Sequence, residues 1–261
     1  MELLGRGRCA EVFLQEDGKA LKLFYDGGAA AAEAVKAAVV GRSCPMAPAF
    51  YGRTERDGRS GLLYACVAGA SLKDQVLSGA LGADGGGRHM ADLHRRIHAC
   101  SGEGLPSALE YFGPRIERFP LLSAAGRGRL LDYIARDAAR GLCHGDLHPD
   151  NILIDVDGRV WAIDWANAYR GNPLGDAART EYLLLNGLPP GAAGIGDEEG
   201  RMRAQAAQAY MSSLNLEFDP QAWDLWRLAM LVGRYGEGAE AEAPVLREAV
   251  GQIAARHGDF A

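Results

Sequence analysis

The chain has 261 residues, of which 48% are hydrophobic, so it can bury the core of one large or two modest domains. Its formal net charge of -6 provides no general basic field for nucleic acid or an anionic membrane, and no apolar run approaches the roughly 18 residues of a membrane span. Five single cysteines without a C-x-x-C pair favour reduced thiols, and we expect a soluble, cytoplasmic protein without nucleic-acid or membrane partners.

Residues 1–68 have the pattern of short strands around one helix. Runs of apolar and β-branched residues are separated by turn residues, which is typical of a small antiparallel sheet. An alanine-rich stretch between the second and third runs favours a helix. The predicted strands are 11–15, 20–24, 50–56 and 62–67, and the predicted helix is 29–40.

Helical periodicity dominates residues 69–261. Two Gly-rich segments interrupt it, and we expect 82–87 to be a flexible surface loop and 187–196 to be a lid or a disordered connection. A strand-rich lobe would thus join a larger helical lobe, and the junction is a natural place for a ligand cleft. The predicted helices are 90–99, 129–139, 201–215, 221–233 and 243–257.

The most informative pattern lies between residues 143 and 165. The segment His144-Gly-Asp-Leu-His-Pro-Asp-Asn151 precedes two apolar runs that flank Asp157-Gly158, a pair typical of a two-residue hairpin loop. With that loop, Asn151 would face Asp164 across the two strands. An amide oxygen and a carboxylate, with Asp146 upstream, are the oxygen ligands that Mg²⁺ prefers.

This set of side chains suits phosphoryl transfer, which needs positioning, metal ions on the phosphates and a carboxylate that orients the attacking hydroxyl. Asp146 would be the catalytic base, with Asn151 and Asp164 as metal ligands. Taken singly, Asp146 and Asn151 could be ordinary turn residues. The joint pattern of motif, strand, turn and Ile-Asp-Trp argues against that interpretation.

The motif His144-Gly-Asp-x-His-x-x-Asn151 followed by Ile163-Asp-Trp165 resembles the signature of the aminoglycoside phosphotransferase and choline kinase-like small-molecule kinases, relatives of the protein kinases. The resemblance implies an α+β, bilobal protein kinase-like fold, with a small antiparallel-sheet amino-terminal lobe (1–68) and a larger, mainly helical lobe (69–261). It assigns the same roles to Asp146, Asn151 and Asp164. It also implies that Asp176, at the end of Gly171-Asn-Pro-Leu-Gly-Asp176, braces the catalytic loop, the segment of residues 144–151.

The amino-terminal lobe carries the resemblance further. Gly5-Arg-Gly-Arg-Cys-Ala-Glu-Val12 resembles a kinase Gly-rich loop, with Gly5 and Gly7 near the phosphates and Ala10 in place of the third glycine. Lys22 would contact the phosphates, and Glu33 is the only acidic residue between Asp26 and Glu55 that could anchor it.

Leu62-Leu-Tyr-Ala-Cys-Val-Ala-Gly69 resembles the strand and hinge that hold an adenine base. Backbone groups near Ala65 and Val67 would then bind the base. The side chains that could sandwich it are Val12, Ala20 and Ile163.

We therefore expect an ATP-dependent kinase, with GTP as an alternative donor and Mg²⁺ as cofactor, that phosphorylates a hydroxyl of a small molecule. The acceptor stays open among aminoglycosides, amino alcohols, sugars and homoserine, and the oligomeric state is not indicated. Residues 197–261 hold eleven acidic and six basic residues, which suits a cationic partner or a solvated surface equally. The alternative function is a nucleotide-binding pseudokinase or regulatory module without turnover, and a zinc site at His94 and His98 is disfavoured.

Overall fold

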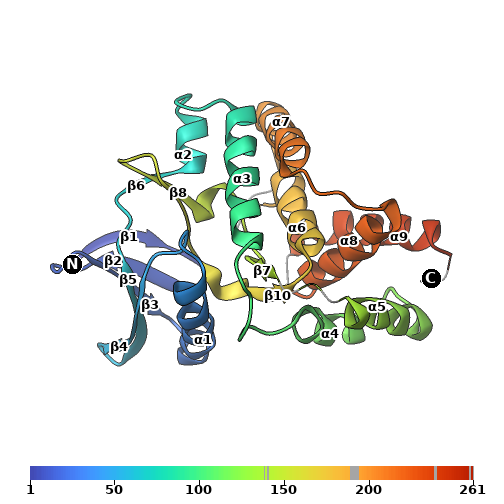
Figure 1. Ribbon diagram of the computed structural model, residues 1–261, viewed down its shortest axis with the longest axis horizontal. Helices are drawn as coiled ribbons and strands as arrows, with labels where there is room; N and C mark the ends of the chain where they lie inside the picture. Colours follow the sequence, from blue (N-terminus) through green and yellow to red (C-terminus); the bar gives the residue numbers. More distant parts are fainter. Residues whose placement is uncertain (138, 140, 189–193, 238–239, 259, 261) are drawn as a thin grey trace.

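A five-stranded antiparallel sheet and one helix form the amino-terminal end of the molecule (Figure 1). The computed structural model describes the chain apart from residues 138, 140, 189–193, 238–239, 259 and 261. Neighbouring strands follow the order β1-β2-β3-β5-β4. The strands are β1 Glu2–Arg6, β2 Ala10–Leu14, β3 Lys19–Phe24, β4 Phe50–Arg56 and β5 Arg59–Ala65.

The helix of this end, α1 (Gly27–Ser43), begins where the sequence provides a cap. Asp26 accepts hydrogen bonds from the backbone N–H groups of Gly28 and Ala29, which satisfies two donors of the first turn. The small side chains of Ala30 and Ala34 are buried with strand residues in one apolar cluster. Alanine therefore lets α1 lie close to the sheet, and this position brings Glu33 to β3.

Two small sheets, eight α-helices and three short 3-10 helices lie in the described part of the chain that follows. The three-stranded sheet has the order β6-β8-β9 and the two-stranded sheet pairs β10 with β7. Their strands are β6 Gly69–Ser71, β7 Gly141–Cys143, β8 Ile152–Asp155, β9 Val160–Ala162 and β10 Tyr169–Gly171. The helices are α2 Leu72–Leu77, α3 Ala83–His98, α4 Ala108–Arg118, α5 Ala124–Arg136, α6 Pro173–Asn186, α7 Asp197–Leu214, α8 Pro220–Tyr235 and α9 Ala243–Arg256.

The helices pack around two apolar clusters. One contains Trp226 of α8 and joins α4, α5, α6, α8 and α9, and the other contains Tyr210 of α7 and joins α3, α6 and α7. In Figure 1, α3, α6 and α7 lie together above β7 and β10, and the two chain ends lie at opposite ends of the molecule. The predicted α+β class, with a small antiparallel sheet before a helical part, is confirmed.

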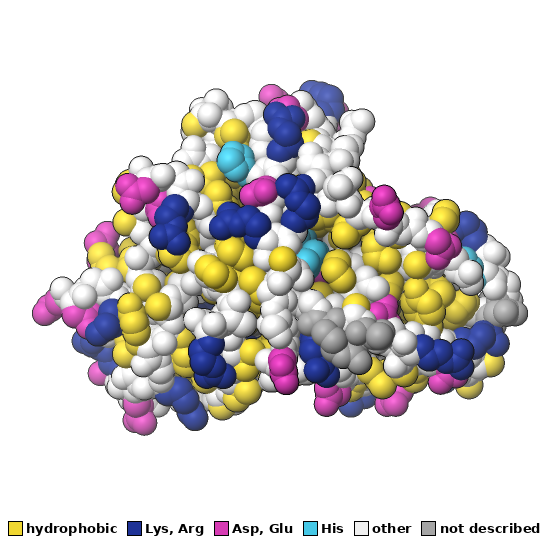
Figure 2. All heavy atoms as spheres, viewed as in Figure 1, with side chains coloured by type: hydrophobic (Ala, Val, Ile, Leu, Met, Phe, Trp, Pro, Cys, Tyr) yellow, Lys and Arg dark blue, Asp and Glu magenta, His cyan; other side chains and the backbone are white. Residues whose placement is uncertain are grey.

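Within the described residues, no helix has both the length and the apolar character needed to cross a membrane. The face displayed in Figure 2 carries basic and acidic side chains that are interspersed. Of the predicted lid at 187–196, residues 189–193 lie outside the described part of the chain.

The prediction of a flexible loop at 82–87 is wrong, because α3 begins at Ala83 and its glycines are buried. A Cβ atom on Gly87 would lie 2.2 Å from the carbonyl oxygen of Ala206 on α7. The glycine therefore permits a close approach of α3 and α7 rather than a turn.

The predicted hairpin register is wrong by one residue. Ile152 pairs with Ala162, and the N–H of Ile163 donates to Asn151 O at 2.9 Å, so Asn151 opposes Ile163 and not Asp164. The loop has three residues: Gly158 has a φ of 77° and its N–H donates to Asp155 O. The Asp155 carboxylate also accepts from the N–H groups of Asp157 and Arg159, which holds the longer turn.

Candidate active site

The segment that contains Asp146 connects β7 to β8, and Asp176 on α6 holds its backbone. The Asp176 carboxylate accepts hydrogen bonds from the N–H groups of His144 at 2.6 Å and Gly145 at 2.8 Å. Gly145 has a φ of 76°, and a Cβ there would lie 2.3 Å from Asn167 O, so glycine is required. The brace expected from the family resemblance is thus present, and it fixes the loop one residue before Asp146.

Two histidines of α3 anchor Asp176 in turn. Nε2 of His94 and Nε2 of His98 lie 2.8 and 3.2 Å from Asp176 Oδ2, and the Tyr210 hydroxyl lies 2.6 Å from His94 Nδ1. Burial lowers the pKa of His94 to about 4, so its ring is neutral and donates from Nε2 to the carboxylate. Burial by itself would raise the pKa of Asp176, but His94 and His98 hold it well below its ordinary value.

The carboxylate of Asp146 contacts a buried arginine that sequence reasoning missed. Nη2 and Nε of Arg179 lie 2.7 and 3.3 Å from Asp146 Oδ1. Burial opposes ionisation of Asp146, but the Arg179 guanidinium outweighs it and lowers the pKa of the carboxyl. Asp146 is therefore ionised at neutral pH, with Oδ2 left for other contacts.

Arg179 belongs to a row of five charged side chains that runs from the catalytic loop to the end of α8. Its guanidinium also contacts Glu237 at 2.8 Å, and Arg234 bridges Glu237 at 3.1 Å to Glu242 at 2.5 Å. We call Asp146, Arg179, Glu237, Arg234 and Glu242 the charged row. The acidic residues near the end of the chain that we considered for a cationic partner are thus partly occupied by arginines of this chain.

Lys22 of β3 joins two carboxylates from distant parts of the chain. Its ammonium lies 2.8 Å from Glu33 of α1 and 2.9 Å from Asp164 Oδ1, so the expected pair with Glu33 is present. Tyr64 of β5 donates from its hydroxyl to Glu33 Oε1 at 3.1 Å, a contact that the sequence did not suggest. Burial would lower the pKa of Lys22, but Asp164 and Glu33 together raise it, so the ammonium stays charged.

Asn151 and Asp164 form a donor set that fits Mg²⁺ in chemistry. Asn151 donates from Nδ2 to Asp146 O at 3.0 Å, so its amide oxygen is the atom left for a metal. Asp164 has a φ of 61° and its side chain is 45% exposed. That left-handed conformation is uncommon outside glycine and is found at functional sites. Only one of its oxygens contacts Lys22, which leaves the other for a metal.

The residues expected to surround the nucleotide lie on the amino-terminal sheet and beside it. Gly7 lies in the β1–β2 connection, and a Cβ at Gly5 would meet no atom within 4 Å, so there is open space beside Gly5. Val12 pairs with Lys22, and Ala20 pairs with Tyr64 on β5. These positions put the apolar candidates on the strands that carry and flank Lys22.

The hinge prediction needs one restriction. The N–H of Ala65 donates to Ala49 O at 2.8 Å, so this N–H is not left for a base. Val67 follows the end of β5 and is partly buried. Ile163 is also partly buried, and its carbonyl lies 3.1 Å from His144 Nε2, which ties it to the catalytic loop.

The comparisons with known proteins place this arrangement in a family. The sequence pattern of the phosphotransferase enzyme family (APH) matches residues 29–206, more than half of the chain and the part that holds every catalytic-loop residue described above. The chain belongs to this family. It is accordingly a transferase of the kinase type, with an alcohol group as acceptor.

Solved structures similar to this phosphotransferase share its fold at low identity. The choline kinase LicA from Streptococcus pneumoniae is 14% identical, with 98% of this chain and 93% of that chain covered and a TM-score of 0.59. A thermostable mutant of aminoglycoside phosphotransferase APH(4)-Ia, in a ternary complex with ADP and hygromycin B, is 18% identical, with 96% and 92% covered and a TM-score of 0.58.

An aminoglycoside-3'-phosphotransferase of type VIII is 19% identical to this phosphotransferase, with 88% of this chain and 90% of that chain covered and a TM-score of 0.52. No curated protein sequence matches the chain significantly. The identities are too low to carry a substrate over to this phosphotransferase, so the acceptor has to be argued from its own residues.

Proposed function

We propose that this phosphotransferase moves the γ-phosphate of ATP to a hydroxyl of a small molecule in a cleft between a lobe of residues 1–68 and a lobe of residues 69–261. One observation carries the proposal: the ammonium of Lys22 contacts Glu33 at 2.8 Å and Asp164 at 2.9 Å. A cation suited to phosphates therefore adjoins a carboxylate suited to their metal. Asn151 donates to Asp146 O, and its own carbonyl accepts from the N–H of Ile163, the residue before Asp164.

Each side chain has a distinct task in this proposal. Lys22 neutralises and steadies the phosphates, and Asn151 and Asp164 would hold Mg²⁺, which when bound would offset the negative charge of the phosphates. Asp146 orients the acceptor hydroxyl and takes its proton. Because Arg179 contacts Oδ1 of Asp146, Oδ2 is the oxygen that would accept this proton.

The adenine would lie between Val12, Ala20 and Ile163, against the carbonyl of Ala65 and the backbone of Val67. ATP is the expected donor, and a parallel assay with GTP tests the alternative. All five cysteines are free thiols, which suits the reducing cytosol where we expect the enzyme to act.

An ATP-consumption assay against aminoglycosides, amino alcohols and sugars tests the proposal, with the Asp146→Asn variant as the control. For any acceptor that responds, we expect this variant to lower kcat by about 10²- to 10⁴-fold, because a positioned base contributes that much. Its ATP affinity, measured by calorimetry, should be largely unchanged. Equal turnover in the variant would refute Asp146 as the base. Nucleotide binding without turnover on any acceptor would favour the alternative, a nucleotide-binding module.

A further inference from the structure

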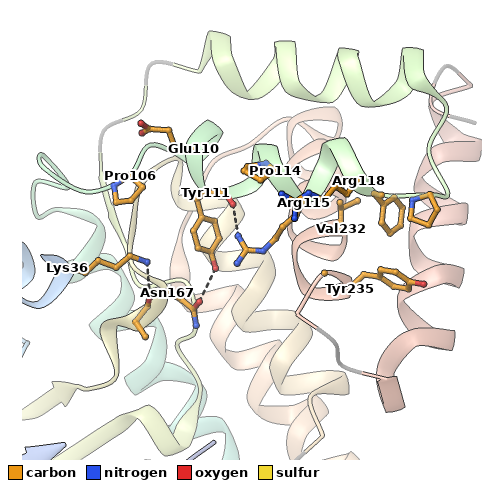
Figure 3. Close-up of a pocket in the computed structure, with 14 residues that line it drawn as sticks. Lys36, Pro106, Glu110, Tyr111, Pro114, Arg115, Arg118, Asn167, Val232 and Tyr235 are labelled. Carbon is orange, nitrogen blue, oxygen red and sulfur yellow. Dashed lines mark hydrogen bonds between the residues drawn. The ribbon is translucent and has the colours of Figure 1, made fainter. Parts of the chain in front are cut away.

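A pocket with a volume of about 740 Å³ opens beside the catalytic loop, between α1, α4 and the end of α8 (Figure 3). This size is typical of small-molecule sites. Two of its lining residues adjoin the reaction centre: Asn167 packs on Gly145, next to Asp146, and Gly236 precedes Glu237, which contacts Arg179. The pocket is therefore placed to hold a molecule whose hydroxyl reaches Asp146.

The charged side chains of this pocket are mostly basic, although the whole chain has a net charge of -6. Lys36 enters from α1, and Arg115 and Arg118 enter from α4. Figure 3 shows the Lys36 ammonium and the Arg115 guanidinium on the two sides of Tyr111, at 5.8 and 4.7 Å from its ring centroid. Three cations from two elements thus converge on one cavity.

The single acidic residue of the lining does not neutralise these cations. Glu110 accepts hydrogen bonds from the N–H and the hydroxyl of Ser107, which caps α4, and in Figure 3 its carboxylate points away from Arg115. Within the part of the chain that the structure describes, Lys36, Arg115 and Arg118 form no ion pair with a carboxylate.

The contacts that these cations do make leave donors for a ligand. Lys36 donates to Ala166 O at 2.6 Å and Arg115 donates from Nη1 to Tyr111 O at 2.6 Å. An ammonium has three donors and a guanidinium has five, so both retain donors that a carboxylate or a phosphate could accept from. Burial and the nearby Arg115 lower the pKa of Lys36 to about 8 and outweigh the opposite effect of Glu33.

We infer that the acceptor of this phosphotransferase is a hydroxylated small molecule with an anionic group, a carboxylate or a phosphate, which Arg115 and Lys36 bind while its hydroxyl meets Asp146. This inference rests on the proposed function and narrows its acceptor. Tyr111, Phe119 and Tyr235 supply an apolar wall for the carbon skeleton. A polycation such as an aminoglycoside would be repelled by the same three side chains.

Pairs of acceptors that differ in charge test the inference: glycerate against glycerol, and glucose 6-phosphate against glucose, with one aminoglycoside as the polycation. We expect the anionic member of at least one pair to have the higher kcat/KM. Arg115→Met should raise its KM by about tenfold to hundredfold, the equivalent of one charge-assisted contact, with kcat changed less than about twofold. Arg115→Lys should recover part of the affinity, since it keeps the charge.

The control variant is Arg88→Met, on the exposed face of α3, which removes an arginine that pairs with Asp84 outside the pocket. It should leave the KM values of the anionic and of the neutral acceptor unchanged.

The anion site is overturned, and the proposed function stands, if phosphate transfer depends on Asp146 but favours the neutral or the polycationic compounds. If no compound accepts phosphate, the proposed function fails, and calorimetry with the Asp146→Asn protein decides the anion site. The anion site is supported if glycerate or glucose 6-phosphate binds more tightly than its neutral counterpart and Arg115→Met abolishes this difference. Equal binding of both members of each pair overturns the anion site.

Discussion

The Arg179 guanidinium on α6 lies 2.7 Å from the Asp146 carboxylate, measured from Nη2 to Oδ1, and is itself 4% exposed. A buried cation beside the carboxylate that we propose as the base has two effects. It keeps the carboxyl ionised, and it directs one of the two oxygens away from the acceptor. Glu237 contacts the same guanidinium and so limits how strongly Arg179 holds Asp146.

Removal of this cation should change the pH dependence of the reaction. In Arg179→Gln the burial of Asp146 remains while its counter-charge is lost, so the pKa of Asp146 should rise. The base works only when ionised, and its ionised fraction falls as the pH drops through that pKa. The acid limb of the kcat profile, measured from pH 4 to 8, should therefore move to higher pH. An unchanged limb in protein that circular dichroism shows to be folded would contradict the role of Arg179.

The contact between Lys22 and Glu33 should matter mainly for the nucleotide. Glu33→Gln removes the charge that orients Lys22 and leaves the ammonium to Asp164 alone, so we expect the KM for ATP to rise by about tenfold, the loss of one charge-assisted bond. Tyr64→Phe removes only the 3.1 Å hydrogen bond to Glu33 and should have a smaller effect. Steady-state kinetics at saturating acceptor measure both variants, and equal KM values in Glu33→Gln and the wild type would exclude the anchoring role.

Two buried histidines should make the fold sensitive to mild acid. Burial lowers the pKa of His94 and of His144 to about 4, below the ordinary value near 6.5 of an unfolded chain. The unfolded chain then binds more protons between those values, so stability is full above pH 6.5 and is lost as the pH falls towards 4. Urea unfolding at pH 7, 5.5 and 4.5 should show this loss, and His94→Gln should make it shallower. The exposed His89→Gln variant is the control and should keep the wild-type slope.

A pair of glycine substitutions tests the contact between α3 and α7. Gly87→Ala places a Cβ 2.2 Å from Ala206 O, and overpacking of this kind costs about 1–3 kcal/mol. Gly251→Ala on α9 makes the same change where a Cβ meets no atom within 4 Å, and should stabilise by about 0.5–1 kcal/mol through helix propensity. Thermal unfolding of both variants gives the comparison. Shifts of the same sign would show that Gly87 does not fix the helix spacing.

The residues of the candidate catalytic loop could be grouped from the sequence because they are neighbours in the chain. Asp146 and Asn151 are five positions apart, and the Asp-Gly turn that follows marks the hairpin that leads to Asp164. The same turn misled us on register, since Asp155 uses its own carboxylate to hold a three-residue loop. Side-chain bonds to the backbone of a turn are hard to infer from the residue types alone.

Arg179 could not be predicted, because its partner lies 33 positions away and its helix gave no periodic signal. Ten of the fourteen residues of α6 are buried, so the buried residues lie on all sides of the helix instead of forming one stripe. Similarly, Gly113 and Pro114 disfavour a helix, so α4 was not predicted from the sequence. Three glycines made the start of α3 resemble a loop. Close packing explains the glycines of α3, and packing depends on residues far away in the chain.

The charged row contains three carboxylates and two guanidinium groups, so it has one surplus negative charge. Glu242 and Glu237 have side chains that are 3% and 11% exposed and both contact Arg234, whereas the Asp146 side chain is 23% exposed and shares one guanidinium with Glu237. The surplus is therefore most available at Asp146. In the proposed reaction Asp146 takes the proton of an acceptor hydroxyl, and the formal charge of the row then changes from one surplus negative charge to zero, at its most exposed member.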